Sequence, residues 1–210
     1  MKTISLGAVL ASALICNVAS AQGYLSLGAN LNSLDSSDFR SAQGGVTAEY
    51  DRGLGLRVAL GRKFSSFRGE IELSRYENDV DNVLVAGLQQ TGTRGETTAL
   101  GLMFNGYYDF SPGSRLSPYI GLGLGNLELD YRGFGSDVNP VILEADDAVL
   151  GFQFMFGGTY EISDTTSFFG ELRFLSTDES TVQTSFETGG VETEINYDSN
   201  ILQVGVNFNF

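Results

Sequence analysis

Apolar side chains recur at every second position along most of this chain, which is the pattern of β-strands that have one apolar face. The clearest case is the C-terminal segment, whose apolar face holds Leu202, Val204, Val206, Phe208 and Phe210. The alternation predicts eight strands, at residues 23–32, 54–64, 67–77, 98–110, 116–131, 148–161, 166–177 and 202–210. Within 116–131 the alternation changes phase after Gly125, and a β-bulge near residues 125–126 would account for the change.

Short and long connections alternate between these strands. The short ones consist of turn-forming residues, at 65–66, 111–114 and 163–165. The long ones are polar, at 33–53, 78–94, 132–147 and 178–199. Short turns on one side and long loops on the other are what an up-and-down meander requires. The sequence therefore predicts an all-β fold, an eight-stranded antiparallel up-and-down barrel.

The chemistry of the two strand faces indicates which face is the outside. A soluble barrel packs large apolar side chains inward, whereas a transmembrane barrel turns them toward lipid and keeps small or polar groups inside. Here the second face is rich in Gly, Asn and Gln, which fill an apolar core poorly. We therefore predict a transmembrane β-barrel. Charged side chains on its inward face are expected to pair with one another, because an unpaired buried charge costs several kcal/mol. This predicted charge network consists of Arg57, Arg68, Glu70, Glu72, Glu171 and Arg173.

Aromatic residues gather at the strand ends beside the short turns. Tyr and Phe at such positions form the interfacial girdle of membrane proteins. The predicted girdle consists of Phe64, Phe67, Tyr108, Phe110, Tyr119, Phe168 and Phe210.

Composition excludes several classes of function. The chain has 12 Lys+Arg against 26 Asp+Glu, and the resulting net charge of -14 disfavours a nucleic-acid partner. It has no histidine, which excludes His-based metal sites and Ser-His-Asp triads. A Gly-x-Ser-x-Gly nucleophile elbow is also absent. Glu70 and Glu72 have the spacing of a glycosidase pair, but interior ion pairing explains them better. We expect no enzymatic activity, no catalytic residue, no metal and no cofactor.

The first 21 residues have the features of a secretory signal peptide. Lys2 precedes an apolar stretch, and Ala19-Ser20-Ala21 matches the small-x-small pattern that a signal peptidase cleaves. Cleavage there would remove Cys16, the only cysteine, so the exported chain would need no disulfide. We expect a signal peptide at 1–21, with cleavage specified by Ala19 and Ala21, and one barrel domain at 22–210.

Three segments resemble those of small outer membrane β-barrels of Gram-negative bacteria, the group of opacity-type proteins, OmpX and the transmembrane domain of OmpA. These segments are the opening at 24–29, the strand at 118–125 and the ending in Phe210. The resemblance implies an integral protein of the outer membrane, with both termini and the short turns in the periplasm. It also implies that Val206, Phe208 and Phe210 form the C-terminal signal read by the barrel-assembly machinery.

The long loops hold many of the carboxylates, namely Asp35, Asp38, Asp79, Asp81, Asp137, Glu144, Asp146, Asp147, Asp178, Glu179, Glu187, Glu192 and Glu194. A solvated surface is the simplest interpretation. Divalent cations bridging to lipopolysaccharide phosphates, or a basic cell-surface partner, would also suit these loops.

From these features we expect a monomer with a structural or surface-interaction role, embedded among outer membrane lipid and lipopolysaccharide. Its lumen would be closed by side chains, because eight strands leave no room for a water-filled channel. Two alternatives stay open at this point. One is a minor porin with a narrow diffusion path, and the other is a soluble periplasmic lipid-binding barrel.

Overall fold

Antiparallel β-strands make up nearly all of the described chain. The computed structural model describes residues 22–41, 44–85, 88–89, 92, 94–135, 145–178, 180–186, 189–195 and 197–210. The signal peptide predicted at 1–21, with Ala19 and Ala21, therefore lies outside the described residues. The strands are β1 (Gln22–Leu34), β2 (Ser37–Ser41), β3 (Gly44–Tyr50), β4 (Gly53–Phe64), β5 (Phe67–Val85), β6 (Leu88–Gln89), β7 (Arg94–Asp109), β8 (Leu116–Gly135), β9 (Ala145–Ser163), β10 (Thr166–Thr177), β11 (Ser180–Phe186), β12 (Gly189–Ile195) and β13 (Ser199–Asn209).

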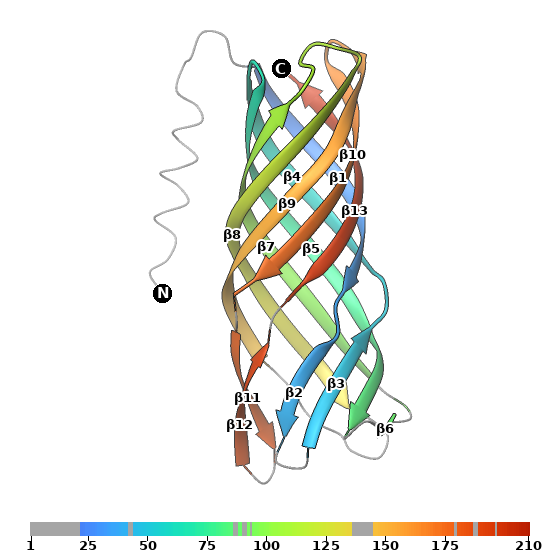
Figure 1. Ribbon diagram of the computed structural model, residues 1–210, viewed down its shortest axis with the longest axis vertical. Coiled ribbons are helices and arrows are strands. Elements are labelled where there is room, and N and C mark those ends of the chain that lie inside the picture. Colours follow the sequence, from blue (N-terminus) through green and yellow to red (C-terminus); the bar gives the residue numbers. More distant parts are fainter. Residues whose placement is uncertain are drawn as a thin grey trace.

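Eight of these strands close into a barrel, in the order β1, β4, β5, β7, β8, β9, β10 and β13 (Figure 1). The barrel closes where β13 pairs antiparallel with β1, from Tyr24–Asn209 to Leu34–Ser199. The predicted fold class and all eight predicted strands are thereby confirmed. No helix long and apolar enough to cross a membrane occurs among the residues that the structure describes.

The two ends of the barrel differ in how the strands are connected (Figure 1). At the turn end, short connections follow β4, β7 and β9, and Ser65 opens the first of them with a φ of 57°. At the loop end, the segments predicted as long polar loops contain strands of their own. The β2–β3 hairpin pairs with the end of β5, and β11 pairs with β12. The barrel wall therefore continues well beyond the predicted strand ends.

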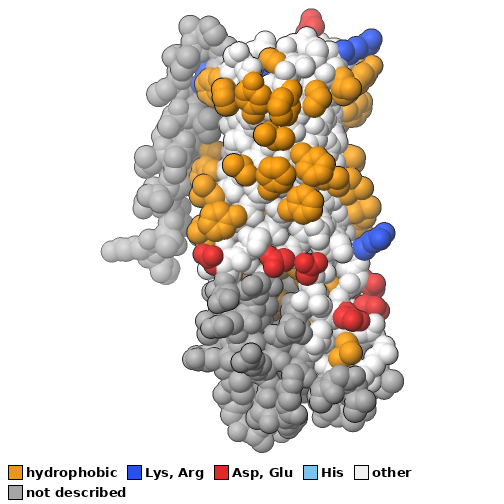
Figure 2. All heavy atoms as spheres, in the orientation of Figure 1, with side chains coloured by type: hydrophobic (Ala, Val, Ile, Leu, Met, Phe, Trp, Pro, Cys, Tyr) orange, Lys and Arg blue, Asp and Glu red, His pale blue; other side chains and the backbone are white. Residues whose placement is uncertain are grey.

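The outer face of the barrel carries an apolar belt, which is the set of exposed large apolar side chains nearer the turn end. Toward the loop end, the belt stops at Leu31, Leu54, Leu73, Leu100, Leu124, Leu150, Phe174 and Leu202. The next outward positions are small or polar, namely Ser33, Arg52, Arg75, Thr98, Asn126, Ala148, Ser176 and Asn200. Figure 2 shows the same division on the face in view, with acidic side chains beginning where the hydrophobic ones end.

This belt decides between the membrane and the soluble interpretation. In a soluble barrel, the large apolar side chains of β9 and β13 would point to the barrel axis. Here they are exposed on the outside, at 50% for Phe152, 44% for Phe154, 52% for Leu202 and 60% for Val204. The stretch from Leu54 to Phe64 also has the length of a transmembrane strand, about 9–11 residues. The alternative of a soluble lipid-binding barrel is therefore wrong.

The β-bulge predicted near residues 125–126 is also wrong. Strand β8 pairs with β7 and β9 in continuous register through Gly125 and Asn126. The apolar residues do change parity along β8, but the backbone keeps its register, so what changes is the face of the strand that carries them. Leu127 and Leu129 point into the lumen and are fully buried, whereas Leu124 points outward. Apolar residues therefore switch from the outer to the inner face at the limit of the belt.

One member of the predicted aromatic girdle is misplaced. Phe64, Phe67, Tyr108, Phe110, Phe168 and Phe210 lie exposed on the outer surface. Tyr119 is only 3% exposed and lies in the lumen, because it shares strand parity with the inward residues Ser117 and Gly121. Tyr160 of β9 lies exposed on the outer face instead.

Candidate functional site

The lumen contains two clusters of different chemistry, and the one nearer the turn end is charged. Six residues were predicted to form an interior charge network: Arg57, Arg68, Glu70, Glu72, Glu171 and Arg173. The structure places all six on inward positions of β4, β5 and β10, and all six are buried. We call this cluster, together with Asp109, the turn-end lumen.

Glu70 is held by groups from three other strands. Arg57 Nη2 of β4 lies 2.5 Å from its Oε2, and the Tyr24 hydroxyl of β1 donates to Oε1 at 2.6 Å. The Tyr107 hydroxyl of β7 donates to Oε2 at 3.2 Å. Strand pairing fixes these contacts, since β1, β4, β5 and β7 are consecutive in the barrel. Both carboxylate oxygens of Glu70 are therefore satisfied without water.

Glu72 joins the two sides of the lumen. Arg173, which comes from β10 on another part of the wall, forms a bidentate pair with it: Nη1 contacts Oε1, and Nη2 lies 3.0 Å from Oε2. Arg57 Nε is 3.1 Å from Glu72 Oε2, and the Asn105 amide donates to the same oxygen at 2.9 Å. Charge-assisted, bidentate bonds of this kind are the strongest hydrogen bonds in proteins. The lumen is thus bridged from β5 to β10.

Glu171 completes the arrangement around Arg173. Arg173 Nη2 lies 2.9 Å from Glu171 Oε1, and the Gln203 amide donates to the same oxygen at 3.2 Å. The Tyr119 hydroxyl donates to Oε2 at 3.1 Å. Arg173 is therefore shared by two carboxylates, and each carboxylate has a further donor.

Sequence reasoning missed Asp109, the seventh member of the network. Arg68 Nε lies 2.9 Å from Asp109 Oδ2, and the Arg68 guanidinium stacks at 4.5 Å and 4.6 Å from the ring centroids of Tyr107 and Tyr119. A vestibule of about 300 Å³ at the turn end reaches this pair. The parity of β7 places Asp109 inward with Tyr107, so the alternation contained a signal for its role.

Tyrosine rings pack against glycines in this part of the wall. A Cβ added at Gly61 would lie 2.2 Å from Cζ of Tyr24, and one added at Gly121 would lie 2.5 Å from Cδ1 of Tyr107. The two tyrosine rings fit against these positions of the neighbouring strands only because the positions have no side chain. Glycines on the inward face therefore make room for the hydroxyls that bind the carboxylates.

The second cluster lies toward the loop end and is apolar. We call it the loop-end lumen, and its buried members are Leu34, Ala48, Tyr76, Val80, Ala99, Met103, Leu127, Leu129, Tyr131, Val149, Leu175, Tyr197 and Ile201. It touches the charged cluster where Arg173 Nη1 lies 3.3 Å from the Tyr76 hydroxyl. Burial raises the pKa of the Tyr197 phenol, which precedes β13, well above its usual value. The second cluster was not predicted, because Leu34, Ala48, Val80 and Tyr197 had been assigned to polar loops and the phase of Leu127, Leu129 and Tyr131 to a bulge.

The loop-end surface carries exposed carboxylates. Asp35, Asp79, Asp81 and Asp178 are exposed there. The other predicted loop carboxylates lie outside the part of the chain whose side chains are described. Among the described residues, no group of three or more Asp, Glu or Cys has the arrangement of a metal site.

Together, the belt, the closed sheet and the filled lumen define a membrane-spanning β-barrel. The chain matches the model of the outer membrane protein β-barrel domain over residues 3–210, and it belongs to that family. Membership of this family implies location in an outer membrane. A comparison with curated proteins gave no significant match.

Solved structures of outer membrane proteins share the fold. OprG from Pseudomonas aeruginosa is 17% identical, with 90% of this chain and 96% of that chain covered and a TM-score of 0.65. Neisserial surface protein A is 19% identical, with 91% of this chain and 99% of that chain covered and a TM-score of 0.55. AlkL, whose structure was determined in lipid bilayers, is 16% identical, with 93% of each chain covered and a TM-score of 0.53. Identities this low establish the common fold alone.

Proposed function

We propose that this protein is a closed barrel with a structural and surface-interaction role in the cell envelope, rather than a pore or an enzyme. The observation that carries the proposal is the filled lumen. Arg173, Glu72 and Glu171 bridge the turn-end lumen, and the apolar cluster fills the loop-end lumen. A solute would have to displace both, and breaking buried ion pairs costs about 3–5 kcal/mol each.

Electrical recording tests the closed lumen. Residues 22–210, refolded into planar lipid bilayers, are expected to give no reproducible conductance steps. Insertion is verified separately by the shift in gel mobility between unheated and heated samples. Reproducible steps from inserted protein would contradict the proposal and favour the alternative of a minor porin with a narrow diffusion path.

The loop end is the proposed interaction surface, facing the outside of the cell. It extends beyond the belt as the paired hairpins β2–β3 and β11–β12, and it exposes Asp79 and Asp81. An exposed acidic surface suits a basic partner on another cell or envelope component. Because the barrel itself only anchors this surface, a monomer suffices.

Labelling of single cysteines on intact cells tests this orientation. Asp79→Cys at the loop end is expected to react with a membrane-impermeant maleimide, whereas Asp164→Cys at the turn end should react only after the cells are broken. Both positions are exposed, so accessibility to the reagent is matched. The opposite labelling pattern would overturn the assigned orientation.

The proposed contact with the barrel-assembly machinery involves Val206, Phe208 and Phe210. Phe208 and Phe210 are exposed on the outside of the last strand, so a partner can reach them. Phe210→Ala is expected to lower the amount of assembled barrel in cells several-fold. Phe110→Ala removes another exposed aromatic side chain at the turn end and serves as the control. Equal loss in both variants would show that only membrane anchoring matters.

A further inference from the structure

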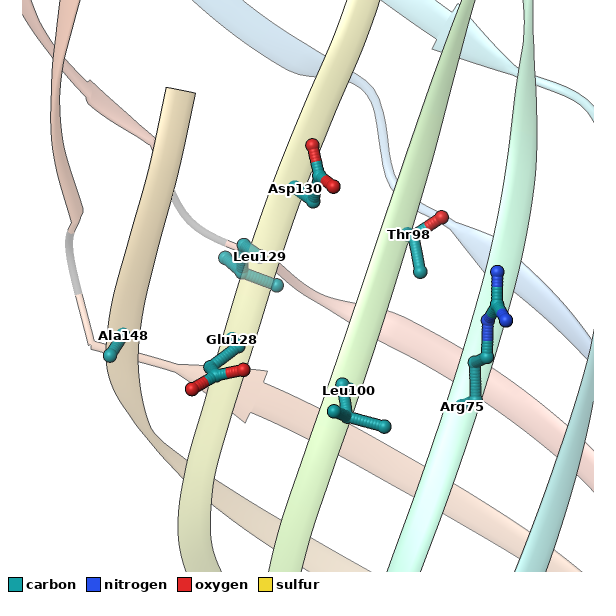
Figure 3. Close-up of a pocket in the computed structure, with 7 residues that line it drawn as sticks. All are labelled: Arg75, Thr98, Leu100, Glu128, Leu129, Asp130 and Ala148. Carbon is teal, nitrogen blue, oxygen red and sulfur yellow. The ribbon is translucent and has the colours of Figure 1, made fainter. Parts of the chain in front are cut away.

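Charged side chains gather at two hollows of the molecule, one outside the wall and one inside it. The first is a groove of about 630 Å³ on the outer wall, across β5, β7, β8 and β9 (Figure 3). Its Arg75 is already paired with Glu77, and its Asp130 is paired with Arg132. The second is the vestibule of about 300 Å³ at the turn end. There, cationic and hydroxyl donors are left without partners, which points to a ligand.

Two cations of the vestibule lie directly opposite each other. Lys63 of β4 pairs with Arg68 of β5 in the antiparallel register, and both side chains line the vestibule. Like charges at directly opposed positions of a sheet destabilise it. Lys63 Nζ donates to a neutral group, the side-chain oxygen of Asn209, at 3.0 Å, and it forms no ion pair with a carboxylate among the described residues. The two cations therefore lack a shared anion.

Arg68 is held in one orientation, and part of its guanidinium has no partner. Its Nε lies 2.9 Å from Asp109 Oδ2, and the guanidinium lies over the rings of Tyr107 and Tyr119. The side chain is only 5% exposed, yet Nη2 has no hydrogen-bond partner in the part of the chain that the structure describes. Because leaving a buried, charged donor unsatisfied is costly, Nη2 is a preorganised donor for an anion.

Ser117 of β8 supplies another donor without a partner. It lines the vestibule, is only 8% exposed, and its Oγ has no hydrogen-bond partner among the residues described. Glu161 lines the vestibule from β9, on the side of the barrel opposite β4, and within the described chain its carboxylate forms no ion pair. The two cations of the vestibule are thus balanced by Asp109 and Glu161. A ligand with a single negative charge is therefore accommodated more easily than a dianionic phosphate.

The inner end of the vestibule is closed by the charge network. Behind Arg68, the hydroxyls of Tyr24 and Tyr107 both donate to Glu70 across the lumen. A volume of about 300 Å³ equals that of about ten water molecules, which is room for the last one or two residues of a peptide. A hollow with one opening admits the end of a chain, whereas an internal segment would have to enter and leave by the same opening.

We propose that the vestibule binds the C-terminal carboxylate of a peptide chain. Lys63 Nζ, Arg68 Nη2 and the Ser117 hydroxyl donate to the carboxylate, and Glu161 disfavours a second negative charge. A chain terminus with one negative charge matches both the donors without partners and the single opening of the hollow. This site is additional to the structural role proposed above, and conductance is no part of its test, so the two can fail separately.

Fluorescence anisotropy with a short peptide tests this site. The probe is trialanine with a neutral dansyl group at its amino end, added to residues 22–210 refolded in detergent. Its free acid is expected to bind at least about tenfold more tightly than its C-terminal amide, which lacks the charge. The amide shares every other contact of the probe, including contacts with detergent, so it is the matched control.

Neighbouring residues of β4 provide a matched pair of variants. Lys63→Gln removes the inward cation and should weaken binding of the free acid at least about tenfold, whereas Lys63→Arg should retain it. Arg62→Gln removes the adjacent cation, which lies over the ring of the outward residue Phe64, and should leave binding unchanged. Ser117→Ala should weaken binding about threefold. The shift in gel mobility on heating verifies that each variant is folded.

Three results would overturn the assignment. Equal affinity for the acid and the amide would show that the carboxylate is not recognised. Displacement of the probe by inorganic phosphate at lower concentration than by acetylated trialanine would identify a site for small anions instead. An unchanged affinity in Lys63→Gln would place the bound peptide elsewhere on the barrel.

Discussion

The part of the barrel within the belt and the part beyond it are packed by opposite rules. Within the belt, Leu122 and Leu124 of β8 face outward and charged groups fill the lumen. Beyond it, Leu127 and Leu129 of the same strand face inward, and Glu128 faces outward. The first arrangement is that of a membrane barrel, and the second is that of a soluble one. The solvent outside the wall therefore decides what fills the inside.

Other strands change in the same way, which makes the change a property of the barrel. On β10, Phe174 faces outward and the next residue, Leu175, is buried in the loop-end lumen. On β13, Leu202 is exposed and Ile201 is buried. In a chain of this kind, a phase change in apolar alternation marks the limit of the membrane. Four substitutions sharpen or break this comparison.

The largest effect is expected in the turn-end lumen. Arg173→Ala leaves Glu72 and Glu171 without their shared cation, so the free energy of unfolding should fall by about 3–5 kcal/mol. This free energy is measured by urea unfolding in phosphatidylcholine vesicles, with intrinsic tyrosine fluorescence as the signal. The control Arg132→Ala breaks an exposed pair and should cost about 0–1 kcal/mol. Similar losses would show that the network contributes no more than a surface pair.

A somewhat smaller effect is expected in the loop-end lumen. Leu127→Ala should cost about 3 kcal/mol in the same assay, because it leaves a cavity in a packed core. A Cβ added at Gly151 would lie 2.2 Å from Leu127 Cδ1, which shows how closely this side chain is packed. Leu122→Ala, on the lipid side of the same strand, leaves a space that lipid fills and should cost roughly 1–2 kcal/mol. If Leu122→Ala costs more, the two parts of the barrel do not differ as described.

The third substitution tests the inward position of Tyr119. Tyr119→Phe removes a hydrogen bond to the Glu171 carboxylate and should lower the free energy of unfolding by about 2 kcal/mol. Tyr160→Phe, on the outer face, should change it by less than about 0.5 kcal/mol. A larger loss for Tyr160→Phe than for Tyr119→Phe would contradict the inward position of Tyr119.

The smallest effect is expected at Asn30, on the inward face of β1. Asn30 is buried, and neither polar atom of its side chain has a hydrogen-bond partner among the described residues. Asn30→Ala should therefore change the unfolding free energy by less than about 1 kcal/mol. Asn105→Ala, by contrast, removes a donor to Glu72 and should cost about 2 kcal/mol. Equal costs would mean that contact with the charged network does not set the stability of lumen asparagines.

Alternation was enough to predict the strands, turn-forming residues predicted the short connections, and the chemistry of the two faces predicted the outward direction of the belt. It was enough because an apolar belt forces period two on every strand that crosses it. It failed beyond the belt, where the rule inverts, so Leu127 and Tyr131 were explained by a bulge and strands β2, β3, β11 and β12 were missed. The pairing partners of Arg173 depend on strands distant in sequence, and barrel closure and tilt determine which of these meet.

The pairing of β1 with β13 has a consequence for how the molecule comes into being. Tyr24 pairs with Asn209, so one edge of the first strand is covered only when almost the last residue of the chain is in place. Contacts this distant along the chain make folding slow. Until they form, an incomplete wall exposes two strand edges that lipid cannot satisfy. Closure of β1 on β13 is therefore expected to accompany insertion of the wall into the bilayer rather than to follow it.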